Sequence, residues 1–532
     1  MFTQPLNPTG NIVLTALAAL ISIIVLLILL AGLRMSAWLA TLIGSIVTIL
    51  VAIPLWHSPP VETIEAWIIG ALVGFWYITW ITIWGVTIYN TLALTGKFDV
   101  FRDWVVANAT SDARVQAILL AWSFGALMEG LVGFGYPWAI VSPLLVALGY
   151  DWIRAIQTSA LANNAPVSFG ALGTPVIALS LVTGIPLMAM SAAVGRVVAL
   201  LAVFVPFILL IIVDGVRGLK DAWPVALIGG LGYITGQFPV SNYLGPYLPD
   251  IAGSLISFFI LLAFLRVWRP RRIITFGSQS TNGSGQQRKF TTKDVVMAWL
   301  PFIILIIVVT LWTGPWSPLP HFIITTWSVK AYSTVLHKVV AVAFEVNPFV
   351  AGTSIFVSWL IIWAILGASP KVFVESLKRM WHQMWGAILT GFFVVGLAYV
   401  FNYSGMAYSL AYASSLVGLI FVIISPFLGF IGAALSGSNT ASNTLFGALQ
   451  AAVGKLLGLP VPLLPAANSV GSELGKPVAP QTVSVGVSTT PYVRKEGIIV
   501  RRNLPWAIMY VFYLIFIISL YAFVFPWAMP KI

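Results

Sequence analysis

The stretch NNAPVSFGALGTP, residues 163–175, gathers amide, hydroxyl, glycine and proline residues in a chain that is otherwise strongly apolar. Of the 532 residues, 59% are hydrophobic and 8% are charged. A soluble domain has about 25% charged residues, and a water-soluble fold cannot hide so much apolar surface. The solvent of this chain is therefore lipid, and residues 163–175 interrupt a membrane-spanning pattern.

Runs of mostly apolar residues recur on both sides of this stretch. A spanning helix needs about 20 such residues, and we expect roughly 12 to 14 membrane segments in an all-α polytopic protein of the inner or plasma membrane. The first run is long and no positive charge precedes it, so we predict a span and not a cleaved signal. The clearest runs are 11–33, 36–56, 65–95, 185–213, 251–267, 294–312, 339–366, 383–401, 416–435 and 505–527.

Basic residues form three clusters, and membrane proteins keep such clusters on the cytoplasmic side. The largest flanks a Gly- and Ser-rich stretch that is typical of a flexible linker. The loop 313–337 is poor in Lys and Arg, so we expect it outside, together with both termini. The formal net charge of +12 follows from these loops and does not indicate nucleic acid. The chain thus divides into an N-terminal membrane half, 1–267, a basic cytoplasmic linker, 268–293, and a C-terminal membrane half, 294–532.

Four segments break the apolar pattern with Gly, Pro, Asn, Ser and charged residues. Irregular backbone inside a bilayer is tolerated where it lines a cavity or packs on protein, and such breaks are the best sequence pointer to a transport site. The breaks form two pairs, one in each half of the chain, which favours a repeated half-structure. An odd number of passes between the halves would make the repeats inverted. The four segments are 125–137, 163–175, 436–444 and 466–477.

The residue types in these breaks suit a small anion. A broken helix presents free N–H groups that attract negative charge, and glycine lets the backbone approach a ligand closely. Asn and Ser side chains can read a 2-hydroxyl group. Tight helix packing could explain one such stretch, but four paired stretches favour a site. The predicted substrate-binding residues are Asn163, Asn164, Ser168, Ser438, Asn439, Asn443 and Asn468, and the helix-break glycines are Gly130, Gly133, Gly135, Gly170, Gly173, Gly437, Gly471 and Gly475.

Glu129 follows one apolar stretch and precedes another, where an ionised carboxylate is costly. Burial favours the protonated form of a carboxyl group, so we predict that Glu129 carries a coupled proton. A structural carboxyl group bonded to the backbone is the alternative. Glu473 and Lys476 lie three residues apart and could form a buried pair, or Lys476 could meet a substrate carboxylate. Arg196, with apolar residues on both sides, is an equal candidate for that role.

The sequence offers no sign of an enzyme. It has no cysteine, and its four histidines lack metal-ligand spacing. We find no catalytic motif and no phosphate-binding loop, so we predict neither catalysis nor a bound metal or cofactor. The single, scattered acidic residues also argue against the charged ring of a channel filter. These exclusions favour a secondary transporter.

At the breaks the chain resembles the lactate permease family, and the resemblance covers nearly the whole length. Residues 129–135 look like that family's EGxxGFG segment, and residues 164–173 look like its NTAPVAFGAMG segment. Residues 242–251 resemble NFxGPxLPDI, residues 437–446 resemble GSDTSSNALF, and residues 467–481 resemble AANxxGGxxGKxxxPQ. Several such segments in the right order are more specific than any single Gly-rich run.

The resemblance implies uptake of lactate, and often of glycolate, together with protons. It also implies two inverted repeats with re-entrant hairpins, as in other ion transporters, by fold-level analogy. A sodium-coupled carboxylate or dicarboxylate carrier is the alternative, because the paired Asn, Ser and Thr residues could bind sodium. The expected partners are the substrate, protons and membrane lipid. The sequence leaves both a monomer and a homodimer open.

Two residues depart from the family pattern. Asn439 stands where the pattern has an Asp, and Glu473 stands where it has an uncharged residue before Gly-Lys. One acid is lost and one is gained, both in the breaks of the second half. We therefore hypothesise that Glu473 takes over the role of the missing carboxylate, and we add Glu473 to Glu129 as a candidate for proton coupling.

Overall fold

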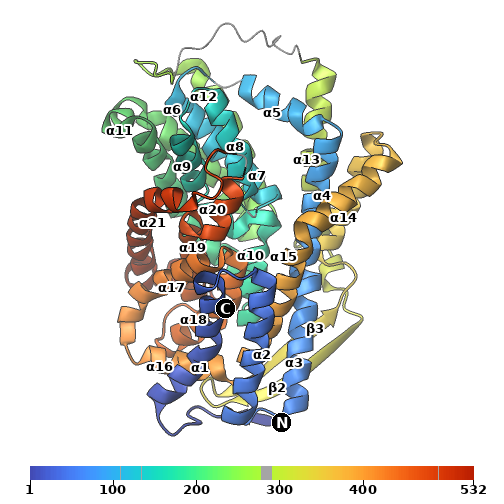
Figure 1. Cartoon of the computed structure of the whole chain (residues 1–532), viewed down its shortest axis with the longest axis vertical. Helices are drawn as coiled ribbons and strands as arrows, with labels where there is room; N and C mark the ends of the chain where they lie inside the picture. Colours follow the sequence, from blue (N-terminus) through green and yellow to red (C-terminus); the bar gives the residue numbers. More distant parts are fainter. Residues whose placement is uncertain (108–109, 134, 277–289, 489) are drawn as a thin grey trace.

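The computed structural model describes residues 1–107, 110–133, 135–276, 290–488 and 490–532. Within these ranges nine helices are long and apolar enough to cross a membrane, and ten if one strongly bent pair counts as a span. Many of them run along the long axis of the molecule (Figure 1). The predicted all-α polytopic membrane fold is confirmed.

The first half of the chain alternates long spans with short helices. Its long elements are α1 (Ile12–Leu27), α2 (Ala37–Leu55), α3 (Pro60–Val73), α4 (Trp80–Leu94), α11 (Leu187–Tyr243) and α12 (Pro249–Val267). Its short elements are α5 (Lys97–Ala107), α6 (Ala113–Gln116), α7 (Gly125–Leu131), α8 (Tyr136–Ala147), α9 (Trp152–Ala162) and α10 (Gly170–Thr183). The π-helices η1 (Ile28–Gly32), η2 (Gly74–Thr79) and η3 (Ala117–Phe124) join neighbouring helices.

The second half has the same mixture of lengths. Its helices are α13 (Thr292–Thr313), α14 (Ala351–Ile365), α15 (Pro370–Ser404), α16 (Met406–Ser415), α17 (Phe421–Ser436), α18 (Asn439–Leu456), α19 (Leu463–Gly475), α20 (Pro480–Gly486) and α21 (Glu496–Ser519). Most of the predicted linker, residues 277–289, lies outside the described residues. On either side of it α12 ends at Val267 and α13 begins at Thr292.

The nine or ten long apolar helices of the described residues are fewer than the 12 to 14 segments expected. One reason is that α11 counts once, although its backbone leaves helical geometry at Asp214 and Gly215 and joins two apolar legs. Another is that α14 and α8 are too short to count. Glycine, proline and asparagine divide the apolar chain near the breaks into helices shorter than a bilayer.

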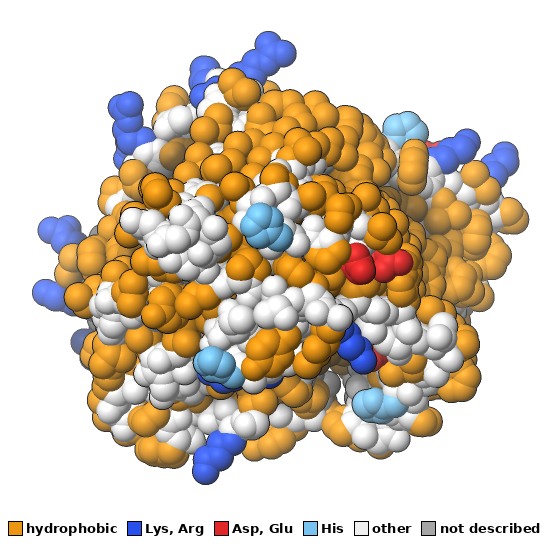
Figure 2. All heavy atoms as spheres, turned by 90° about the horizontal axis from the view of Figure 1, so that it is seen from below, with side chains coloured by type: hydrophobic (Ala, Val, Ile, Leu, Met, Phe, Trp, Pro, Cys, Tyr) orange, Lys and Arg blue, Asp and Glu red, His pale blue; other side chains and the backbone are white. Residues whose placement is uncertain are grey.

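A three-stranded sheet lies where a loop and the start of a span were expected. β2 (Thr325–Ser333) pairs antiparallel with β3 (Lys338–Val346), and β1 (Phe2–Gln4) pairs parallel with β2. The apolar Val and Ala residues of β3 belong to a strand, so the predicted run 339–366 contributes a strand and the 15-residue helix α14. The sheet holds the N-terminus at the end of the molecule opposite α6 (Figure 1). Apolar side chains cover most of that end (Figure 2).

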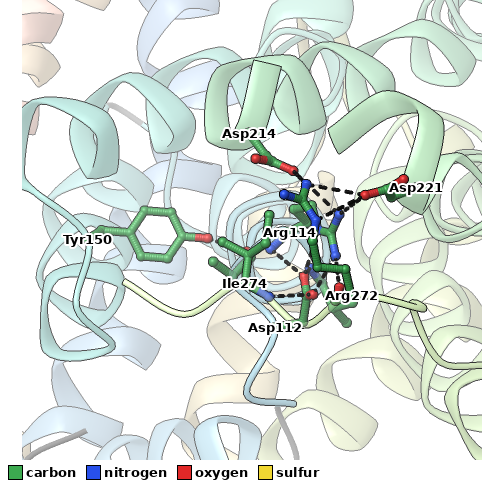
Figure 3. Close-up of polar contacts among 9 residues, drawn as sticks. Asp112, Arg114, Tyr150, Asp214, Asp221, Arg272 and Ile274 are labelled. Carbon is green, nitrogen blue, oxygen red and sulfur yellow. Dashed lines mark hydrogen bonds and ion pairs between the residues drawn. The ribbon is translucent and has the colours of Figure 1, made fainter. Parts of the chain in front are cut away.

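At the other end a cluster of ion pairs, here called the Arg114 cluster, joins Asp112, Arg114, Asp214, Asp221 and Arg272 (Figure 3). The fully buried Arg114 side chain lies 2.7 Å from the Asp112 carboxylate, and Arg272 lies 2.8 Å from Asp214 at the bend of α11. The amide of Ala113 also donates to the carbonyl of residue 274 at 2.7 Å. The cluster therefore ties the segment that leaves α12 to α6, and α6 leads through η3 into α7, which carries the predicted proton site.

Candidate functional site

The first-half break folds back sharply after α9. The chain bends by 68° between α9 and the segment 167–183, which comprises η4 (Val167–Phe169) and α10. Ala171, Leu172 and Gly173 have positive φ angles of 44°, 58° and 79°. Non-glycine residues rarely adopt this conformation, and such strain gathers at functional sites. A Cβ atom on Gly173 would lie 2.2 Å from the carbonyl oxygen of Pro246, so the close approach requires glycine.

The two breaks of the second half, 436–444 and 466–477, pack against the break 163–175 of the first half. α17 ends at Ser436, Gly437 follows with a φ of 71°, and Ser438 caps α18 by accepting a hydrogen bond from the amide of Ala441. α18 packs against α10, and α19 packs against η4. α19 ends at Gly475, where the short helix η7 (Lys476–Val478) takes over. Segments about 300 residues apart in the chain thus share one buried junction.

Ser168 is the centre of the polar contacts at this junction. Its amide donates to Glu473 Oε1 at 2.8 Å, and its hydroxyl lies 2.8 Å from the hydroxyl of Ser469. The amide group of Asn439 donates to the carbonyl of Ser469 at 3.1 Å and to Ser168 Oγ at 3.5 Å. Both residues that depart from the family pattern, Asn439 and Glu473, therefore contact the same serine.

Two of the predicted amides are occupied by protein partners. Asn443 Nδ2 donates to Ser469 Oγ at 2.9 Å, and Asn468 Nδ2 donates to Asn443 Oδ1 at 2.9 Å. Gln450, which sequence analysis did not single out, donates to Asn468 Oδ1 at 3.1 Å. These hydrogen bonds hold the two breaks of the second half, 436–444 and 466–477, together. Other buried atoms lack a hydrogen-bond partner among the described residues: Asn164 Nδ2, Asn164 Oδ1, Asn439 Oδ1 and Glu473 Oε2.

An ion pair joins the first break to the fourth. Lys476 Nζ lies 3.0 Å from Glu129 Oε1, and Asn163 Nδ2 donates to Glu129 Oε2 at 2.8 Å. Both charged side chains are almost fully buried. The suggested pair of Lys476 with Glu473 does not form, because α19 ends between them and Lys476 reaches Glu129 while Glu473 reaches Ser168.

Arg196 lies outside these contacts. Its Nε donates to Asn242 Oδ1 at 2.9 Å, and its Nη1 donates to the carbonyl of Ala528. The structure therefore connects Arg196 with the second leg of α11 and with the C-terminal segment. Of the two cations proposed to meet a substrate carboxylate, Lys476 is the one that connects two of the breaks, the first and the fourth.

The break glycines fall into three groups by their geometry. A Cβ atom on Gly170 would lie 2.5 Å from Glu129 Oε1, and one on Gly130 would lie 2.8 Å from the Cβ of Asp250. Gly471 and Gly475 instead let α19 approach the backbone of α17 closely. The remaining predicted glycines have positive φ angles: Gly133, Gly135, Gly173 and Gly437.

Two cavities lie at opposite ends of the α10–α18 pair. One has a volume of about 560 Å³ and is lined by Thr174 near the start of α10 and by Ser438 and Thr440 at the start of α18. The other, of about 780 Å³, is lined by the last residues of α10, by Lys455 at the end of α18 and by strand β3. The two cavities thus border the α10–α18 pair near its two ends.

The sequence model of the family described as L-lactate permease matches residues 15–525. The chain belongs to this family. Among L-lactate permease relatives, the protein of Bacillus subtilis is 34% identical over 99% of this chain and 100% of its own length, and that of Salmonella typhimurium is 32% identical over both full lengths. The glycolate permease GlcA of Escherichia coli is 36% identical over 98% of each chain.

Membership in the L-lactate permease family makes the chain a transport protein, and the family is not one of enzymes. Together with the apolar helices it places the chain in the plasma membrane as a multi-pass integral protein. Among solved structures, the YdaH transporter of Alcanivorax borkumensis aligns over 87% of this chain and 88% of its own, with 14% identity and a TM-score of 0.45.

Proposed function

We propose that this permease family member imports lactate, glycolate or related 2-hydroxy monocarboxylates by proton symport. The proposal is carried by the buried Glu129–Lys476 pair, together with the side-chain amide of Asn164, which has no hydrogen-bond partner among the described residues. Relatives named L-lactate permease and glycolate permease, similar over nearly the full length, support the substrate class. We further propose that residues 1–267 and 294–532 are the two repeated halves, joined by the linker 268–293.

Lys476 is the proposed partner of the substrate carboxylate. A small anion at the junction needs one cation and a few hydrogen-bonding groups that the protein itself does not use. Asn164 offers a free donor and a free acceptor, and Asn439 offers a free acceptor, within the described structure. A 2-hydroxyl group can donate one hydrogen bond and accept another. The cation of Lys476 together with the free groups of Asn164 and Asn439 therefore suits a hydroxy acid better than a carboxylate without a hydroxyl group.

Glu129 is the proposed carrier of the proton. When Lys476 turns to the substrate, Glu129 loses its cation, and an unpaired buried charge costs several kcal/mol. Protonation of Glu129 removes that cost, so anion and proton are expected to bind together. The amide of Asn163, which donates to Glu129 Oε2, would hold the side chain in place during the exchange.

The two cavities support alternating access to this junction. One reaches the first residues of α10 and α18, and the other reaches their last residues. Movement of the α10–α18 pair against α2 and α15 would open one cavity and close the other. Such rocking of broken helices around a fixed site is common among secondary transporters.

Uptake of labelled L-lactate into proteoliposomes under an inward proton gradient, with and without sodium, tests the proposal. We expect uptake driven by the proton gradient, independent of sodium and competed by glycolate. Glu129→Gln should lose gradient-driven uptake, whereas Glu375→Gln, which removes an exposed carboxylate paired with Arg379, should keep it. A requirement for sodium, or competition by dicarboxylates alone, would establish the sodium-coupled alternative instead.

A further inference from the structure

Asp250, in the first turn of α12, is a third buried carboxyl group beside Glu129 and Glu473. Asp250 is 1% exposed. It packs so closely against α7 that a Cβ atom added to Gly130 would lie 2.8 Å from the Cβ of Asp250. Tyr233 of α11 donates to Asp250 Oδ1 at 2.6 Å, whereas Asp250 Oδ2 has no hydrogen-bond partner among the described residues. One oxygen is thus held in place, and the other is left for a proton.

The charges around Asp250 do not balance if every carboxyl group is ionised. Among the described residues, Lys476 forms its ion pair with Glu129 and with neither of the other two carboxyl groups. The elements packed against α12 add Glu129 from α7 and Tyr233 from α11, while the η3 sequence AILLAWSF contains no titratable side chain. Isolated buried charges cost many kcal/mol. While Lys476 pairs with Glu129, the remaining carboxyl groups are therefore expected to hold protons.

We propose that Asp250 is a second proton-holding residue of the transport cycle, with Tyr233 as its positioning residue. The inference rests on the proposed proton symport. When Lys476 moves to the substrate carboxylate, the O–H bond on Asp250 Oδ2 breaks and the proton forms an O–H bond on the Glu129 carboxylate. The negative charge passes to Asp250, where the Tyr233 hydroxyl stabilises it through a short, charge-assisted hydrogen bond. A proton from the external water then restores Asp250, and Glu129 releases its own proton to the inside when Lys476 returns to it, so one anion and one proton enter.

Two assays in proteoliposomes separate this role from substrate binding. The first measures net uptake of labelled L-lactate driven by a proton gradient. The second measures exchange of external labelled L-lactate for internal unlabelled L-lactate without a gradient, which needs no net loss of the proton. Asp250→Asn should keep exchange near the wild-type rate and lose net uptake by about tenfold or more, as expected when a proton-transfer group is removed.

Tyr233→Phe removes only the hydroxyl that holds Asp250. Because an ionised Asp250 is then less stabilised, it takes up its proton from the external water at higher pH. The external pH of half-maximal net uptake should therefore shift upward while exchange persists. Asp151→Asn is the matched control, since Asp151 is an exposed N-cap and Asn caps helices equally well. The control should leave both assays unchanged.

The outcomes are distinct. Wild-type net uptake in folded Asp250→Asn, or loss of exchange together with net uptake, would overturn the role of Asp250. If Asp250→Asn does not fold, an unchanged pH profile of Tyr233→Phe overturns it. Absence of proton-driven uptake in the wild-type protein would instead contradict the proposed function, whatever the variants do.

Discussion

The ammonium group of Lys476 lies 3.0 Å from the carboxylate of Glu129, although 347 residues separate them in the chain. Glu129 lies in α7, which ends before Gly133, and Lys476 begins η7 directly after α19 ends at Gly475. A strong contact between the two halves of the molecule thus involves the groups that would have to separate when an anion binds.

A double-mutant cycle on this pair should show strong coupling. Removing one partner of a buried ion pair typically costs about 3–5 kcal/mol, because the other charge is left uncompensated. We expect Lys476→Met to lower the thermal unfolding temperature in detergent markedly. Glu129→Gln combined with Lys476→Met should recover most of that loss and still not transport. If the double variant is as unstable as the sum of the single ones, the pair contributes little.

Glu473 and Asn439 should compensate for each other, because both contact Ser168 and each has an oxygen without a partner in the described structure. We expect Glu473→Gln to impair lactate uptake and Asn439→Asp to restore it in part when added to Glu473→Gln. Asn443→Asp, added to Glu473→Gln, is the control. The side-chain amide of Asn443 donates to the carbonyl of Pro175 and to Ser469 Oγ, so its replacement by a carboxylate should not restore lactate uptake. Equal uptake by all variants would contradict the hypothesis.

Gly170 should not tolerate a side chain. A methyl group there would lie 2.5 Å from Glu129 Oε1 and would push the carboxylate away from Lys476. We predict that Gly170→Ala abolishes proton-driven uptake although the protein folds. Gly497→Ala is the matched control, because no atom lies within 4 Å of the added methyl group. Uptake that is equal in the two variants would mean that Glu129 can move freely.

The Arg114 cluster should contribute mainly to stability. Arg114 is buried while Arg272 is about half exposed, and exposed ion pairs contribute about 0–1 kcal/mol. We therefore expect Arg114→Met to lower the unfolding temperature far more than Arg272→Gln, with Arg271→Gln as the neighbouring surface control. A small effect of Arg114→Met would show that water already solvates Asp112.

Sequence patterns located the four breaks because Gly, Pro and Asn are conspicuous in an apolar chain. They could not reveal which breaks touch, since the contact between Glu129 and Lys476 depends on how all intervening helices pack. Asp250 lies in the family-like segment 242–251 but received no predicted role, because an acid after a proline at the start of an apolar run looks like an ordinary helix N-terminus. The strand β3 was mistaken for a span because its Val and Ala residues suit both structures.

The pairing of β1 with β2 also has a consequence for biosynthesis. Residue 2 lies opposite residue 331, so the first strand has no partner until most of the chain has left the ribosome. At about 5–20 residues per second this delay is on the order of half a minute. The strand β1 is therefore synthesised long before the strand with which it pairs, and a chain truncated before β2 would leave β1 without that partner.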